Sequence, residues 1–206
     1  MDDSFAYLCL GRYEPRKEQA ALIEAFARVA SRLPRAALVC AGEAPDAAYL
    51  GRCRRLAAQS GFEARIHLLP HRSDPERLLA AADAFILPST VEGASVGALQ
   101  AAASGLPVLL TDTGAARELL DWGARGSLLP PHLPDLAKAS FADLTAVESQ
   151  APEHVVGALA QAMLAVAEQP DRWRASAAEV QQLRTRIGVG PMAREYERLF
   201  AEVARR

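Results

Sequence analysis

Two segments of the sequence carry the residue types needed to bind a charged, hydroxylated ligand. The first, residues 11–17, reads Gly-Arg-Tyr-Glu-Pro-Arg-Lys and brings Arg12, Arg16 and Lys17 close together. Arginine offers a planar fork of donors and lysine a mobile point charge, a combination suited to a diphosphate. The alternative is that these are solvated surface cations, because short motifs of this kind are weak predictors on their own.

The second segment, residues 89–97, contains an acid, Glu92, among small residues. A carboxylate accepts hydrogen bonds from two hydroxyls at once, which is how it recognises a sugar diol. Gly93 and Gly97 permit a close backbone approach, and Ser95 is expected to cap the helix that follows. The start of a helix favours an anion, so the pattern predicts a site for a phosphate with a sugar beside it. The alternative is a solvated loop acid in front of an ordinary helix.

A third loop, residues 69–74, offers His71 as a possible neighbour of a nucleotide base, although a lone loop histidine is more often merely solvated. No Asp-x-Asp triplet, Walker loop, Gly-x-Gly-x-x-Gly motif or Ser/His/acid set is visible. The remaining histidines show no metal-ligand spacing and are given no role: His67, His132 and His154. The pattern predicts a domain that binds a ligand and has little acid–base machinery of its own.

Apolar strands alternate with helices over the first part of the chain, which predicts a doubly wound α/β domain with a parallel sheet. The expected strands are residues 5–10, 36–41, 66–69, 84–87, 108–111 and, at the edge, 126–129. The expected helices are residues 17–32, 46–60, 75–82 and 115–120, with an Ala-rich helix that Gly105-Leu106-Pro107 ends. In such sheets a ligand binds at the carboxyl ends of the strands, where the three loops described above would converge.

The pattern changes after Pro130-Pro131, which divides the chain into residues 1–131 and a helical extension, residues 132–206, expected to pack on the same domain. Residues 131–150 are expected to cross the surface as a loop with a short helix. Three helices are expected after it, an amphipathic one at residues 152–168, a second at 170–187 and a third at 191–206 with Met192, Tyr196 and Leu199 on one face.

Composition limits the function further. The chain has 206 residues, half of them hydrophobic, and a formal net charge of −2, which gives no reason to expect nucleic-acid binding. It has no long apolar run that would indicate a membrane span and starts with acidic residues, which argues against a signal peptide. Cys9, Cys40 and Cys53 lack partners at metal-ligand spacing and are expected to be reduced packing residues of a cytoplasmic protein.

Together, the order and spacing of these pieces resemble the donor-binding half of a GT-B glycosyltransferase, specifically family 4, whose enzymes retain the anomeric configuration. The resemblance covers about Tyr7 to Pro131 and is weaker through the C-terminal helices. The matching pieces are Gly11-Arg12 with Lys17, residues 81–89, Glu92-Gly93, residues 104–108, Thr113-Gly114 with Glu118, and residues 126–130.

The resemblance implies a role for each matching residue. Arg12 and Lys17 would neutralise the diphosphate of a nucleotide-sugar donor and stabilise the departing nucleoside diphosphate, and Glu92 would hold hydroxyls of the transferred sugar. The leaving phosphate would take the acceptor's proton, and no metal or other cofactor would be required. The further donor-binding positions would be Gly11, Gly93, Ala94, Ser95, Val96, Gly97, Gln100 and His71.

The sequence departs from the family pattern at two donor-binding positions. Gln100 stands where the family has a second Glu, which binds the ribose hydroxyls of the nucleotide. A neutral amide forms hydrogen bonds about 1 kcal/mol weaker than a carboxylate does, nearly a tenfold loss in affinity. Ser95 stands where the family usually has Gly, so its side chain narrows the pocket or adds a hydroxyl contact.

The largest departure is that the chain matches only one half of a GT-B enzyme. The acceptor binds mainly to the other, N-terminal half, so we expect this chain to bind donor and to transfer little or nothing. The apolar face of residues 191–206 is expected to be bare or covered by the missing half or a partner chain, and any membrane association would come through that half.

Two other classes of protein compete with this interpretation. A non-catalytic nucleotide-sugar-binding or interaction module is favoured by Gln100 and by the missing half. An unrelated Rossmann-like protein, such as a nucleotide-sugar epimerase of GT-B shape, would need acid–base residues that are not visible here.

Overall fold

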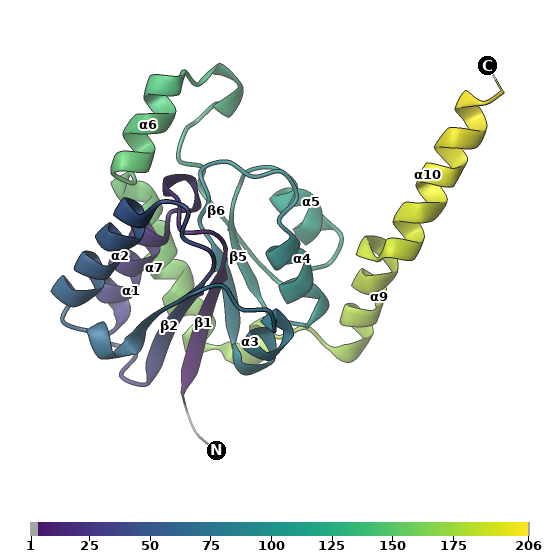
Figure 1. Cartoon of the computed structure of the whole chain (residues 1–206). Coiled ribbons are helices and arrows are strands. Elements are labelled where there is room, and N and C mark those ends of the chain that lie inside the picture. The colour runs from purple at the N-terminus through teal and green to yellow at the C-terminus, as the bar shows by residue number, and fades with distance from the viewer. Residues whose placement is uncertain (1–3, 206) are drawn as a thin grey trace.

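The computed structural model describes residues 4–205, with the side chain of Glu148 left aside. A parallel six-stranded sheet, in the order β3-β2-β1-β4-β5-β6, forms its centre (Figure 1). All six expected strands are present with the expected bounds, and the last one is at an edge. They are β1 (Phe5–Leu10), β2 (Ala36–Ala41), β3 (Ile66–Leu69), β4 (Ala84–Leu87), β5 (Val108–Thr111) and β6 (Gly126–Leu129).

Helices cover both faces of the sheet (Figure 1). One face carries α1 (Gln19–Val29), α2 (Ala47–Gln59) and α7 (Glu153–Glu168), and the other carries α3 (Pro75–Ala81), α4 (Val96–Ala103) and α5 (Ala116–Asp121). The segment before α7 holds the expected short helix, α6 (Phe141–Ser149). Three short 3-10 turns complete this part: η1 (Pro15–Lys17), η2 (Glu63–Arg65) and η3 (Leu136–Lys138).

The strand order reverses between β1 and β4. β1 pairs with β2 on one side, with Leu10 opposite Ala41, and with β4 on the other, with Leu8 opposite Phe85. Ligands of doubly wound sheets bind at this switch point, at the carboxyl ends of the strands. The loops after β1 and β4 therefore start side by side, although 77 positions separate the ends of these strands, Leu10 and Leu87, in sequence.

The first expected helix, residues 17–32, was wrong at its start. Glu18 has a left-handed backbone conformation, with φ of 54°, and is buried. It separates η1, which carries Lys17, from α1, which begins at Gln19. A change of direction at Glu18 thus frees Lys17 from the helix and lets it belong to the loop after β1.

The expected helix over residues 170–187 was also wrong, because it is two helices. α8 (Pro170–Trp173) ends before the backbone N–H of Ala175 donates to the carbonyl of Gly105, and α9 (Ala177–Ile187) begins beyond it. Ser176 starts α9 with a capping box formed with Glu179. The capping box at Ser176 and the hydrogen bond from Ala175 to Gly105 therefore interrupt the helix that the periodicity predicts.

The core lies between the sheet and the helices on each face. Its largest fully buried side chains include Tyr7, Phe26, Phe85, Leu159 and Met163. The three cysteines are buried and free, which confirms that they are packing residues. None of the helices in residues 4–205 is long and apolar enough to cross a bilayer.

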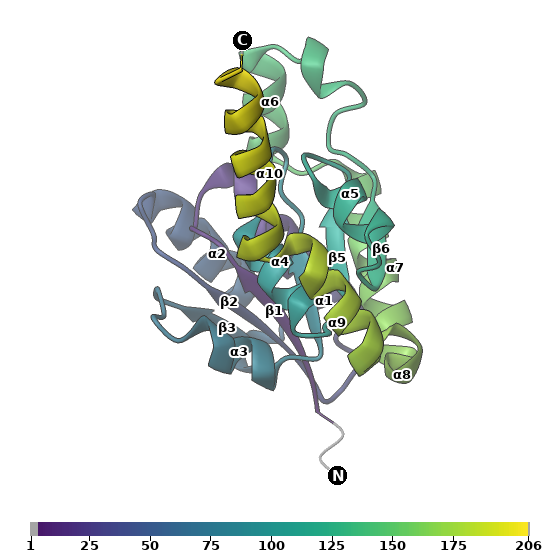
Figure 2. The ribbon, with the colours of Figure 1, turned by 90° about the vertical axis from the view of Figure 1, so that its right-hand side faces the viewer.

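The last helix, α10 (Val189–Val203), differs from all the helices that cover the sheet. It follows α9 and extends beyond the body of the molecule (Figures 1 and 2). Six large apolar side chains on it are at least half exposed: Val189, Met192, Tyr196, Leu199, Phe200 and Val203.

Candidate functional site

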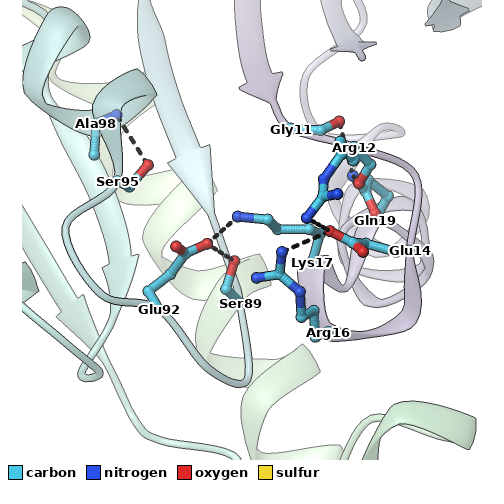
Figure 3. A network of polar contacts seen from close by, with 10 residues as sticks. All are labelled: Gly11, Arg12, Glu14, Arg16, Lys17, Gln19, Ser89, Glu92, Ser95 and Ala98. Atoms are coloured by element: carbon cyan, nitrogen blue, oxygen red, sulfur yellow. Dashed lines mark hydrogen bonds and ion pairs between the residues drawn. The ribbon is translucent and has the colours of Figure 1, made fainter. Parts of the chain in front are cut away.

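An ion pair joins the loops after β1 and β4. Lys17 Nζ donates a hydrogen bond to Glu92 Oε1, and Ser89 Oγ donates to the same oxygen at 2.9 Å (Figure 3). Only 12% of the Lys17 side chain and 13% of the Glu92 side chain is exposed. Partial burial weakens the screening of these charges by water, so the two loops are held together electrostatically.

A second acid, Glu14, holds the two arginines of the first loop. Its Oε1 lies 3.0 Å from Arg12 Nη2 and 2.7 Å from Arg16 Nη2 (Figure 3). Sequence analysis missed this role, although the signal was present: Glu14 stands two residues from each arginine. By partly neutralising both arginines, this carboxylate allows the two positive charges to lie close together in the loop after β1.

The side chain of Gln19, another residue whose role the sequence did not reveal, holds the backbone of the first loop. Its side-chain Nε2 donates to the carbonyl oxygens of Arg12 at 2.9 Å and of Gly11 at 3.4 Å. Gly42 in the loop after β2 packs directly on this turn, since a Cβ there would lie 2.0 Å from the Gly11 carbonyl oxygen. Only glycine fits at position 42 without moving the loop.

Tyr13 anchors the same loop to the ends of two neighbouring strands. Its hydroxyl lies 2.7 Å from the carbonyl oxygen of Cys40 and 3.0 Å from that of Leu69. The side chain is buried, and this burial raises the pKa of Tyr13 far above its ordinary value of 10.0, so the hydroxyl stays a neutral donor. The cations of the loop are therefore carried on a rigid base.

The second loop is fixed against the loop after β5. The N–H of Ala115 donates to the carbonyl of Gly93 at 2.9 Å. Gly114 has a left-handed φ of 55°, and a Cβ on it would come within 2.1 Å of the same carbonyl oxygen. At Gly93 itself, no heavy atom of the described chain other than those of Gly93 and its two sequence neighbours lies within 4 Å of the place a Cβ would take, so the loop is open there.

The helix that follows begins as expected. Ser95 is the N-cap of α4, and its side chain accepts a hydrogen bond from the Ala98 N–H at 3.3 Å. Gly97 faces the core rather than the open site: a Cβ there would lie 3.2 Å from Phe85 Cζ. This glycine lets α4 pack closely on β4, a role other than the ligand approach expected from the sequence.

Two cavities lie beside the loops after β1 and β4. The smaller, about 330 Å³, is lined by residues of the loops after β1, β2 and β3, including Gly11, Arg12, Gly42 and His71. The larger, about 520 Å³, has mostly apolar walls and is lined by Glu92, Gly93, Ala94 and Ser95 together with residues of α5 and the α9–α10 junction. Glu92 borders the larger cavity, while the stem of Lys17 packs beside Gly11 at the smaller one.

The structure thus brings together Arg12, Lys17 and Glu92, the three residues chosen as chemically active, and places His71 on the smaller cavity. Val96 is exposed at the start of α4. Gln100, in the second turn of α4, is exposed and lines neither cavity.

The fold places this site in a known architecture. The structure superimposes on one half of sucrose-phosphate synthase from Thermosynechococcus elongatus, with a TM-score of 0.71 at 22% identity, over 98% of this chain and 47% of that one. It also matches a C-terminal domain of a glycosyl transferase group 1 family protein (LpcC) from Francisella tularensis, with a TM-score of 0.63 at 21% identity, over 90% of this chain and 87% of that one. The protein therefore has the Rossmann-like α/β fold found in GT-B glycosyltransferases.

The sequence identifies the family. Residues 4–146 match the model of the glycosyl transferases group 1, and the chain belongs to this family. It is 34% identical over 138 residues to a phosphatidyl-myo-inositol mannosyltransferase of Mycobacterium tuberculosis, which covers 66% of this chain and 35% of the relative. It is 33% identical over 141 residues to a D-inositol 3-phosphate glycosyltransferase of Corynebacterium efficiens, with 66% and 33% covered. The chain thus spans about a third of the length of these curated relatives.

Proposed function

We propose that this chain is the donor-binding domain of a retaining glycosyltransferase of family 4 that uses a nucleotide-diphosphate-sugar. The observation that carries the proposal is the ion pair that joins a cationic loop to a carboxylate loop, each of which lines one cavity. A diphosphate needs the cations and a sugar needs the carboxylate, and a nucleotide-sugar presents the two groups side by side.

Each charged side chain then takes one part of the donor. Arg12 and Lys17 bind the diphosphate and stabilise the negative charge that develops on the leaving nucleoside diphosphate. Glu92 accepts hydrogen bonds from hydroxyls of the hexose. Backbone N–H groups from Gly93 to Gly97 add donors at the start of α4, where the helix dipole favours a phosphate. The base lies in the smaller cavity, near His71.

The reaction proposed for the complete enzyme keeps the anomeric configuration of the sugar. The bond between the anomeric carbon and the phosphate oxygen breaks, a hydroxyl of the acceptor attacks on the same face, and the leaving phosphate accepts its proton. The protein's part is to position the donor and to stabilise the leaving group electrostatically, without a metal.

The acceptor-binding half is proposed to cover α10. The helix presents Met192, Tyr196 and Leu199 on one exposed face, and the chain spans only about a third of its curated relatives. The proposed partner surface is that of the acceptor half, in the same polypeptide or in a second chain. Alone, this chain binds donor and transfers little or no sugar.

Calorimetric titration with UDP, GDP, ADP and their common sugar conjugates tests the donor site. We expect one nucleotide series to bind, and Arg12→Ala to weaken both the diphosphate and its conjugate about tenfold or more, because charge-assisted hydrogen bonds contribute about 1.5–3 kcal/mol. The matched control is Arg32→Ala, which removes the same charge just after α1, where Arg32 pairs with Glu168. Absence of binding by every compound at millimolar concentration would refute the proposal.

A second candidate function, a non-catalytic nucleotide-sugar-binding module, is favoured by Gln100, which is exposed and lies away from both cavities. The variant Gln100→Glu separates the two functions. A gain in donor affinity without transfer activity, when the variant is assembled with an acceptor half, would favour the module. A gain in both would favour the enzyme.

A further inference from the structure

Lys17 and Glu92 pair with each other in this structure, although the proposed donor would use Lys17 for its diphosphate and Glu92 for its sugar hydroxyls. Glu92 borders the larger cavity, and Gly11 and Arg12 border the smaller one. Lys17 spans between them: its Cδ lies 3.7 Å from the place a Cβ on Gly11 would take, and its ammonium reaches Glu92. A ligand that extends from one cavity into the other meets this ion pair on its way.

We propose that this ion pair makes the site discriminate between the intact nucleotide-sugar and the free nucleoside diphosphate. The proposal rests on the proposed function and deepens it. The pair opposes the binding of a nucleoside diphosphate that lacks the sugar, and it favours the release of that diphosphate once the sugar has been transferred.

The nucleoside diphosphate alone disturbs the pair without replacing it. An ammonium has three N–H donors, so Lys17 can contact a phosphate and Glu92 together. The phosphates, however, add negative charge beside a carboxylate that is only 13% exposed and weakly screened. Like charges this close destabilise the complex, and no group of the diphosphate donates to Glu92. The affinity of the diphosphate is therefore lowered by the presence of the carboxylate.

The intact donor supplies what the diphosphate lacks. Ser89 Oγ and Lys17 Nζ both donate to Glu92 Oε1, and the other carboxylate oxygen points away from Lys17 (Figure 3). Sugar hydroxyls can donate to this second oxygen directly, and a hydroxyl that donates to Oε1 replaces the ammonium, which is then free to bind the diphosphate. After transfer these hydroxyls leave, Glu92 turns back to Lys17, and the hold on the diphosphate weakens.

The test is the isosteric variant Glu92→Gln, titrated with the nucleoside diphosphate and its sugar conjugate from the series that the wild-type chain binds. Removing the carboxylate frees Lys17, so we expect the diphosphate to bind about fivefold more tightly, in keeping with the free energy of a partly exposed ion pair. The conjugate loses charged hydrogen bonds to its hydroxyls, so the preference for it over the diphosphate falls about tenfold.

The control is Asp112→Asn, which removes the same formal charge at the carboxyl end of β5, where Asp112 pairs with Arg117. We expect it to change the affinity for the diphosphate less than twofold, which separates the ion pair from a general change in net charge. Thermal unfolding confirms that each variant folds. Should Glu92→Gln fail to fold, Glu92→Ala is expected to give the same gain for the diphosphate.

The outcomes separate this inference from the proposed function. If the wild-type chain binds nucleotides and the Glu92 variants bind the diphosphate no more tightly, the inference is overturned and the donor site stands. If the variants bind the diphosphate and the wild-type chain does not, the inference is supported. If neither binds any nucleotide, both proposals are overturned.

Discussion

The helices α7 and α10 both have an amphipathic pattern, but the apolar face of α7 is buried in the domain and that of α10 is exposed. Both carry apolar residues at helical spacing, and the periodicity predicts one apolar face on each. On α7 that face is fully buried, with Val155, Leu159 and Met163 packed toward α1 and β6. On α10 the corresponding side chains, among them Met192 and Leu199, are at least half exposed.

This difference shows that an amphipathic pattern predicts which side of a helix is apolar, but not which surface that side packs against. α7 stabilises the domain by burying apolar surface, whereas α10 leaves its surface available for another body. Substitutions on α7 should therefore change the folding of this chain, and substitutions on α10 should change its association.

Leu159→Ala tests the buried helix. Because Leu159 is fully buried, we expect the variant to lose about 3 kcal/mol of unfolding free energy, from lost transfer energy and a cavity. Urea unfolding followed by circular dichroism measures it, with Leu199→Ala on α10 as the matched control. A loss under about 1 kcal/mol would show that α7 is not part of the core.

Low pH should destabilise the chain near the start of α7, through His132. This histidine is buried, and burial lowers its pKa from 6.5 to about 4. The unfolded chain binds the proton more tightly than the folded chain does. The contribution of neutral His132 to the free energy of unfolding is therefore fully present above pH 6.5 and falls as the pH drops toward 4. We expect a loss of about 3 kcal/mol over this range from His132.

Urea unfolding at several pH values measures the loss. The variant His132→Gln should lower stability at neutral pH and remove most of this pH dependence. If the slope between pH 4 and pH 6.5 is the same in the variant and the wild type, other groups account for it.

Tyr7→Phe tests the contact between β1 and α7. The Tyr7 hydroxyl donates to the carbonyl oxygen of Met163 at 2.7 Å, and burial keeps it neutral by raising its pKa. Loss of this buried hydrogen bond should cost about 1 kcal/mol. The same urea assay measures it, and a variant as stable as the wild type would mean that the hydroxyl contributes nothing to this packing.

Leu199→Asp tests the bare helix and should have the smallest effect. We expect the unfolding free energy of this chain to change by about 0.5 kcal/mol or less, because Leu199 is half exposed. Assembly with the proposed acceptor half, measured by analytical ultracentrifugation, should instead be lost. A strongly destabilised monomer would contradict the comparison by showing that α10 packs within the chain.

Much of the site could be predicted from sequence because its parts follow short buried strands. Arg12, Lys17 and Glu92 each belong to a loop directly after such a strand, and parallel strands carry these loops to one edge. Gln19 and Tyr13 could not be predicted, because their partners are backbone carbonyl groups that only the folded chain brings into reach.

The sequence by itself determined the six strands, the cap at Ser95 and the family, because apolar runs, capping residues and motif order are local properties of the chain. Only the tertiary structure decided that Lys17 pairs with Glu92, that the segment before Ser176 breaks a helix, and that α7 is buried while α10 is not. Each of these depends on which distant surface is close enough to bind, and hydrophobic periodicity carries no information about distance.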